Sequence, residues 1–282
     1  MSQDNFQKNI LNFSEKNFGH AKVDPSYAKK SFRFAQKKPS QSQKIKPNMQ
    51  DVLKFFALFS MLIDHLGLFF FEDSWIMRVV GRYAAVVFCF FVGYNYKRPE
   101  DQQYFCLYQK RFRSILLWGI FVHIVQVCTS PYYLDVNILV SLIINLCLLD
   151  LIKNYKIPDV VGIVLCAALS FVTCRIWDYG TFPASIMLLG LRAKSDRSDL
   201  WYSGLLYYSL MCLLIFEYVM MDFSPFQIFI IFYIFLGICY CLIYVDFTRK
   251  VKYRVFLLAR FALPFYVIHI TTIMVISYLY KA

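Results

Sequence analysis

Charged residues are scarce in this chain of 282 residues. They make up 17% of it, whereas soluble domains contain roughly a quarter. Apolar and aromatic residues make up 59%, including 29 phenylalanines and 21 tyrosines. A soluble protein of this length has too little interior to bury so many large apolar side chains, so most of its surface must face lipid. The composition excludes a soluble globular domain and predicts a protein embedded in a lipid bilayer.

Several sequence signals are also missing. The first 50 residues contain no apolar core of the kind found in signal peptides, so we expect no cleavage on export. Neither the alternating pattern of a membrane β-barrel nor a glycine-rich loop for binding phosphate is present. The nine cysteines lie almost all within apolar runs and lack the spacing of metal ligands. We expect the cysteines to be small, buried apolar residues, and we expect neither a bound metal nor disulfides.

Apolar runs of membrane-spanning length recur from Asp51 onward. A helix needs about 20 apolar residues to cross the hydrocarbon core of a bilayer. The runs predict an all-α fold, a polytopic transmembrane helix bundle of nine segments, at residues 52–71, 75–96, 113–129, 135–150, 158–174, 181–191, 201–220, 226–246 and 255–280. Segment 181–191 is too short to cross alone unless residues 178–180 and part of the following loop are buried too. Pro264 is expected to kink the last segment.

Basic residues are distributed unevenly among the breaks between these segments. Residues 1–50 contain ten lysines and arginines against three acidic residues, and most of the other basic residues follow the even-numbered segments. The positive-inside bias assigns such breaks to the cytoplasm. We therefore predict a basic, disordered cytoplasmic tail at residues 1–50, a transmembrane domain at residues 51–282 with nine crossings, and an outside C-terminus. The net charge of +12 then reflects topology, and no nucleic-acid partner is expected.

Ionisable residues inside membrane segments are energetically costly, so each is a candidate for function. The candidates are Asp64 and His65 in the first segment, Arg78 and Arg82 in the second, and Tyr266 and His269 in the ninth. At about 1.5 Å of rise per residue, all of them can meet in the outer half of the membrane. A carboxylate next to an imidazole raises its basicity and can orient it, so Asp64 and His65 favour acid–base chemistry.

Each candidate also has a structural interpretation, which the residues alone leave open. Arg78 can extend to the outer headgroups. Asp64 can act only as the counter-ion of Arg82, and His269 can form a hydrogen bond between helices. Arg260 lies near an inner segment end, where its side chain can extend to the interface or meet an anionic ligand.

Several motifs resemble those of the TraX family and occur in family order over residues 50–280. They are Asp51-Val-Leu-Lys-Phe-Phe-Ala-Leu, Met61-Leu-Ile-Asp-His65, Trp75-Ile-Met, Gly81-Arg82, Trp118-Gly-Ile-Phe, Pro131-Tyr-Tyr, Tyr179-Gly180 and Phe265-Tyr266 with His269. The Asp-His pair with Gly-Arg in the next segment is the most specific of them. TraX proteins of F-like conjugation systems are inner-membrane enzymes associated with N-terminal acetylation of pilin.

The resemblance implies an integral membrane acetyltransferase of the bacterial inner membrane. It implies acetyl-CoA as co-substrate and, as acceptor, the N-terminal amine of a pilin or of another membrane acceptor. Acetyl transfer needs a base and a group that stabilises the developing oxyanion. We expect His65 as base, Asp64 as its orienting carboxylate, Arg82 with Arg78 as anion stabilisers, and His269 and Tyr266 as further site residues. The CoA phosphates would bind inner basic clusters such as Lys110–Arg113 or Arg249–Arg254.

Two other classes of function fit the same residues. In a secondary transporter or proton-coupled channel, Asp64, His65 and the arginines would form a proton relay. Internal inverted repeats would favour that class, but none is visible in the sequence, and nine segments divide badly into two halves. The third class is a non-catalytic membrane subunit of a conjugation or secretion apparatus. Acetyl-CoA-dependent labelling of a membrane acceptor separates the enzyme from both.

Overall fold

The computed structural model describes residues 46–71, 74–96, 110–129, 137–174, 179–194, 200–220 and 224–281. Of the predicted tail, residues 1–45 lie outside these ranges. The described part of the chain contains α-helices and one 3-10 helix, without a β-strand, which confirms the all-α fold. Its elements are α3 (Met49–Phe70), α4 (Trp75–Tyr94), α5 (Lys110–Thr129), α6 (Ile138–Asn154), α7 (Asp159–Thr173), α8 (Phe182–Arg192), α9 (Leu200–Met220), α10 (Pro225–Tyr244), η2 (Arg254–Phe261) and α11 (Ala262–Lys281).

The chain is a multi-pass membrane protein. Among the described residues, five helical stretches are long and apolar enough to cross a membrane: Met49–Phe70, Trp75–Tyr94, Phe112–Thr129, Pro225–Tyr244 and Arg254–Tyr280. Eight of the nine predicted segments each coincide with one α-helix, and their ends differ by only a few residues, whereas segment 255–280 covers η2 and α11. The number of crossings and the side of the C-terminus stay predictions.

The N-terminal end of α3 is held by two sets of polar contacts. Asn48 and Asp51 form a capping box, in which each side chain accepts a hydrogen bond from the backbone N–H of the other residue. This cap explains why the helix begins before the predicted boundary. The Arg260 guanidinium, for which we expected either extension to the interface or an anionic ligand, pairs with the Asp51 carboxylate at 2.9 Å. A backbone bridge between Asn48 and Lys250 lies beside this ion pair.

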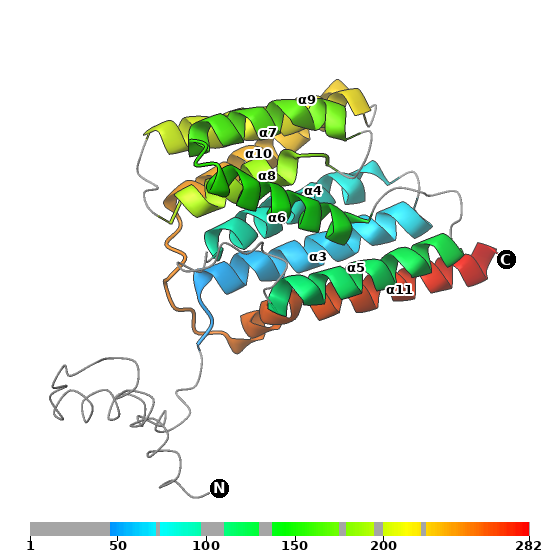
Figure 1. Cartoon of the computed structure of the whole chain (residues 1–282). Coiled ribbons are helices and arrows are strands. Elements are labelled where there is room, and N and C mark those ends of the chain that lie inside the picture. Colours follow the sequence, from blue (N-terminus) through cyan, green and yellow to red (C-terminus); the bar gives the residue numbers. More distant parts are fainter. Residues whose placement is uncertain are drawn as a thin grey trace, which may run out of the picture. The chain divides into compact units, whose positions relative to one another are not determined.

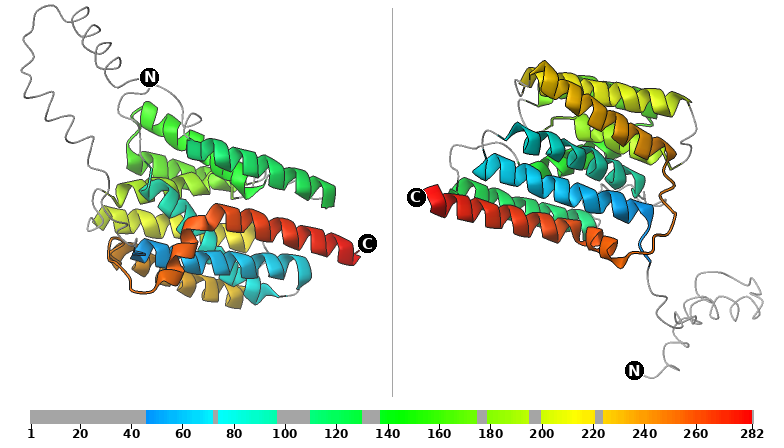
Figure 2. Two further views of the ribbon diagram at one scale, coloured as in Figure 1. Left: turned by 90° about the horizontal axis from the view of Figure 1, so that it is seen from below. Right: turned by 180° about the vertical axis from the view of Figure 1, so that it is seen from behind.

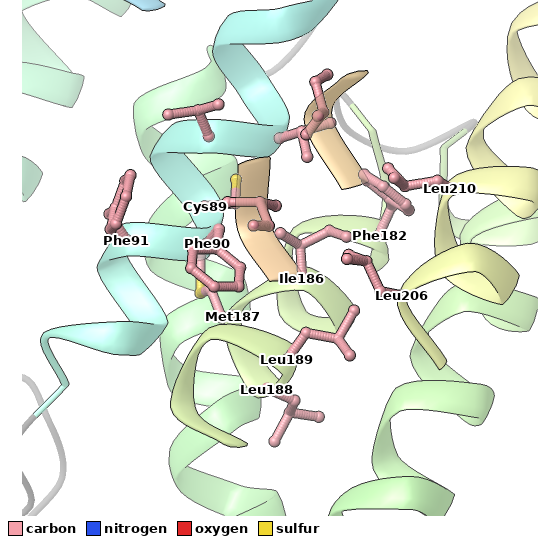
Figure 3. Packing of buried hydrophobic residues seen from close by; sticks show 14 of the residues in the cluster. Cys89, Phe90, Phe91, Phe182, Ile186, Met187, Leu188, Leu189, Leu206 and Leu210 are labelled. Atoms are coloured by element: carbon pink, nitrogen blue, oxygen red, sulfur yellow. The ribbon is translucent and has the colours of Figure 1, made fainter. Parts of the chain in front are cut away.

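The short helix α8 lies at the centre of the bundle. Every residue from Thr181 to Gly190 is buried, and α4, α6, α7 and α9 pack around the helix (Figure 1). Figure 3 shows apolar side chains of α8, such as Ile186, between Phe90 of α4 and Leu206 of α9. Such burial on all sides explains how a helix too short to span a membrane is retained within it.

The backbones of α4 and α8 approach each other at two glycines. A Cβ atom at Gly93 would lie 1.8 Å from the carbonyl oxygen of Met187. At Gly190 it would lie 2.0 Å from the carbonyl oxygen of Phe90. Only glycine fits at these contacts, because backbone atoms cannot move aside without separating the helices.

The turn before α8 is fixed by polar contacts from neighbouring helices. Gly180 has a φ of +53°, which glycine adopts readily. Asn145 of α6 donates to the Gly180 carbonyl at 3.0 Å and accepts from the Ala184 N–H at 3.1 Å. Segment 181–191 was expected to cross only if residues 178–180 and part of the following loop were buried too. Gly180 is buried, Tyr179 is half-buried, and Asp178 lies outside the described residues.

The last predicted segment is not one continuous α-helix. The 3-10 helix η2 occupies Arg254–Phe261, and α11 begins only at Ala262. Pro264 has no backbone N–H, so it cannot donate to the carbonyl of Arg260, and an α-helical hydrogen-bond ladder is interrupted there. A kink was predicted at Pro264, and the structure shows a change from a 3-10 helix to an α-helix shortly before this residue.

A second, smaller apolar cluster joins α5, the beginning of α6, and α11. Its buried members are Val122, Leu139, Tyr266, Val267, Ile270 and Met274. Met61 and Phe69 of α3 pack against it, and α3 also packs along α4. The two views of Figure 2 agree that α11 lies beside both α3 and α5. Helix α3 therefore lies between the main bundle and the α5–α11 layer.

Candidate functional site

The contact between α3 and α4 is close along most of its length. The Tyr83 hydroxyl donates to the Leu53 carbonyl at 3.3 Å, and the Ser60 hydroxyl donates to the Val80 carbonyl at 2.5 Å. Further along, a Cβ atom at Gly67 would lie 2.7 Å from the Cβ of Met77. This close packing fixes the positions of the side chains that lie at the contact between the two helices.

Gly81 allows a carboxylate to lie directly against α4. A Cβ atom at this position would be 2.2 Å from the Cβ of Asp64 and 2.6 Å from its Oδ1. The same Oδ1 lies 2.9 Å from Nη1 of Arg78, one turn earlier in α4. The two side chains are only 15% and 21% exposed. Arg82 belongs to α4, but its side chain is outside the described residues.

On another face of α3, two histidines from distant parts of the chain meet. Nδ1 of His65 lies 2.7 Å from Nε2 of His269, and the rings stack with their centroids 4.9 Å apart. Nδ1 of His269 donates to the Phe265 carbonyl at 2.7 Å. The Tyr266 ring lies edge-on to both histidines, at 5.8 Å and 5.6 Å between centroids. His65, His269 and Tyr266 are thus brought together.

The Asp64–Arg78 pair and the His65–His269 pair occupy one level of the bundle. Consecutive side chains leave an α-helix about 100° apart, so Asp64 faces α4 and His65 faces α11. The contact that the structure shows for Nδ1 of His65 is with His269, and the role of Asp64 as orienting carboxylate stays a prediction.

This level lies far from the end of α3 that carries the Asp51–Arg260 pair. His65 is five residues before the end of α3, which corresponds to about 8 Å, whereas Met49 is about 24 Å away in the other direction. His269 itself is 9% exposed, but Ile268 next to it is 66% exposed. The site is therefore buried just beneath the exposed side of α11.

Three features were not identified from the sequence. The first is the role of Gly81 in making room for Asp64. The glycine is part of the Gly-Arg motif, but the motif does not show this role. The second is the Phe265 carbonyl, whose hydrogen bond no sequence pattern indicates. The third is a buried carboxylate, Asp150 of α6, which accepts a hydrogen bond from the Tyr96 hydroxyl. Because Asp150 is an ionisable residue within an apolar run, the sequence could have marked it as a functional or paired residue.

The part of the chain that the structure describes contains no group of three or more His, Cys, Asp or Glu side chains that could hold a metal ion. The arrangement instead offers two imidazoles in contact beside an ion pair. An imidazole of the pair can accept a proton, and the guanidinium of the ion pair can stabilise a negative charge nearby.

Comparison with known proteins identifies relatives of this chain. A family model described as TraX protein matches residues 49–277. The chain is also 31% identical over 159 residues to an uncharacterised protein of Rickettsia prowazekii (strain Madrid E). That match covers 55% of this chain and 60% of the relative. No solved structure matches.

Proposed function

Because the chain belongs to the TraX family, we propose that it is an integral membrane acetyltransferase that uses acetyl-CoA. Its acceptor is the N-terminal amine of a pilin subunit or another membrane acceptor. Its location is the bacterial inner membrane, with the N-terminus in the cytoplasm and the C-terminus outside. One observation supports the proposal above all others: the His65–His269 contact lies at one level with the Asp64–Arg78 ion pair inside a membrane bundle.

In the proposed reaction, the neutral amine attacks the carbonyl carbon of the acetyl thioester. A nitrogen–carbon bond forms, the carbon–sulfur bond breaks, and the amine proton moves to His65. The same proton then passes to the CoA thiolate, so that His65 returns to its initial state. Transfer to and from a positioned base contributes roughly 10²–10⁴-fold to the rate of such reactions.

The arginines have a separate task. Negative charge develops on the carbonyl oxygen as the amine attacks, and a guanidinium fixed in a buried site stabilises it. Arg78 is held by Asp64 at 2.9 Å, so its position is set before substrate binds. Arg82 follows one helical turn later in α4 and is the second residue proposed for this role. Tyr266 would contact the bound substrate.

The donor has to enter from the cytoplasmic end. Arg249, Lys250, Lys252 and Arg254 are all exposed, and the first two lie beside the beginning of α3. Such a cluster suits the phosphates of CoA, which carry several negative charges. The pantetheine arm would then extend along the bundle, or the acetyl group would be relayed, toward the level of His65.

The test uses the purified full chain in lipid vesicles with radiolabelled acetyl-CoA. The acceptors are a peptide with the N-terminal sequence of a pilin and the same peptide with its amine formylated. We expect label on the free amine only. Absence of label from every acceptor offered would contradict the proposal. Flux of protons or ions across the same vesicles, without acetyl transfer, would identify a transporter instead.

A further inference from the structure

The hydrogen bonds around the histidine pair determine where the protons lie. A backbone carbonyl can only accept, so Nδ1 of His269 must carry the hydrogen that it donates to Phe265. In a neutral imidazole, one nitrogen carries hydrogen and the other has a lone pair. Nε2 of His269 therefore has a lone pair and accepts a hydrogen bond.

The next bond in the chain follows from the same reasoning. Nε2 of His269 lies 2.7 Å from Nδ1 of His65, a hydrogen-bond distance. Because the His269 nitrogen accepts, Nδ1 of His65 must donate. The remaining nitrogen of His65, Nε2, is then left with the lone pair. The donor and the acceptor of each hydrogen bond in this series are thus fixed, starting from the Phe265 carbonyl.

We infer that His269 is a positioning residue, which fixes the tautomer of His65 so that Nε2 of His65 is the atom that accepts the substrate proton. This inference rests on the proposed function for its chemistry, but not for its geometry. The bond that forms in the step joins the amine hydrogen to Nε2 of His65, and the amine nitrogen keeps the electron pair of the broken bond.

The arrangement also suits the protonated state. Once Nε2 has taken the proton, both ring nitrogens of His65 carry hydrogen, and Nδ1 continues to donate to the lone pair of His269. No ring has to rotate between the two states. A hydrogen bond to a charged donor is roughly twice as strong as a neutral one, so His269 stabilises the imidazolium as it forms.

The first experiment is nitrogen NMR on the full chain, labelled at its four histidines and held in lipid nanodiscs. Protonated and unprotonated ring nitrogens give well-separated signals, and a His65→Asn variant assigns the signals of His65. We expect hydrogen on Nδ1 and a lone pair on Nε2. Hydrogen on Nε2 of neutral His65 would overturn the inference, whatever the outcome of the acetyl-transfer assay.

The second experiment compares substitutions in α11 by acetyl-transfer rate. His269→Ala removes the acceptor and is expected to lower kcat by about 10–100-fold, as loss of a partner that orients a ligand or base does. His269→Gln supplies an amide oxygen near the position of Nε2 and should restore most of that loss. Equal rates for the two variants would contradict the assigned role.

A matched control lies in the same helix. The Thr271 hydroxyl donates to the Val267 carbonyl at 2.7 Å, a bond of the same kind and span as that from His269 to Phe265. Thr271→Ala should keep the wild-type rate, because this bond does not reach His65. A loss equal to that of His269→Ala would show a merely structural effect on α11 and would overturn the inference.

Discussion

Replacing Gly81 by alanine tests whether the close α3–α4 contact builds the site. The new Cβ would lie 2.2 Å from the Cβ of Asp64, whereas ordinary contacts begin near 3.4 Å, so the two groups must separate by about 1.2 Å. Overpacking of this size costs about 1–3 kcal/mol of unfolding free energy. The Asp64 carboxylate would also move away from Arg78, and a misplacement of about 1 Å in a catalytic site can lower the rate about 100-fold.

Two assays on the purified variant separate these effects: denaturant unfolding followed by circular dichroism, and the rate of acetyl transfer. Gly204→Ala and Gly237→Ala are the matched controls, because a Cβ atom at either position would meet nothing within 4 Å. Both lie within helices, where alanine is favoured over glycine by about 0.5–1 kcal/mol, so they should be neutral or stabilising. A Gly81→Ala protein as stable and as active as these controls would refute the reasoning.

Two further substitutions test the contacts that hold the fold around the site. Asn145→Ala removes the hydrogen bonds to the Gly180 carbonyl and from the Ala184 N–H, and it should lower the unfolding free energy by about 1–3 kcal/mol in total, at about 0.5–1.5 kcal/mol for each bond. Asp51→Asn should cost only about 1 kcal/mol or less, because the Arg260 side chain is 40% exposed. A double-mutant cycle with Arg260→Gln, measured by unfolding at low and high salt, checks that value and its expected loss with salt.

The fold was largely predictable because membrane helices correspond to long apolar runs in the sequence. Bilayer thickness fixes their length, and the internal hydrogen bonding of helices makes them independent of distant residues. The exceptions depend on tertiary contacts. The early start of α3 depends on the Asn48–Asp51 cap, and the stable position of α8 depends on helices that surround it. Pro264 marked the break before α11 but not its 3-10 geometry.

The site was predictable in its residues but not in its pairing. The cost of ionisable groups in lipid singled out Asp64, His65, Arg78 and His269. Which of them touch depends on how α3 rotates between α4 and α11, so adjacency in sequence could not predict the contact of His65 with His269. On a helix, neighbouring residues face different directions, and the residue that contacts Nδ1 of His65 comes from 204 positions away in the chain. The roles of these residues in catalysis stay predictions.

The most direct test of the account compares the initial rates of acetyl transfer by the wild type and by His65→Asn. The side-chain amide introduced by this substitution would supply an N–H near the position of Nδ1, so the hydrogen bond to His269 and the packing of α3 on α11 are kept, while the base at Nε2 is lost. Unfolding curves confirm that the variant is folded. We predict a rate lower by about 10²–10⁴-fold. A folded variant with a rate within about twofold of the wild type would contradict the claim that His65 is the base.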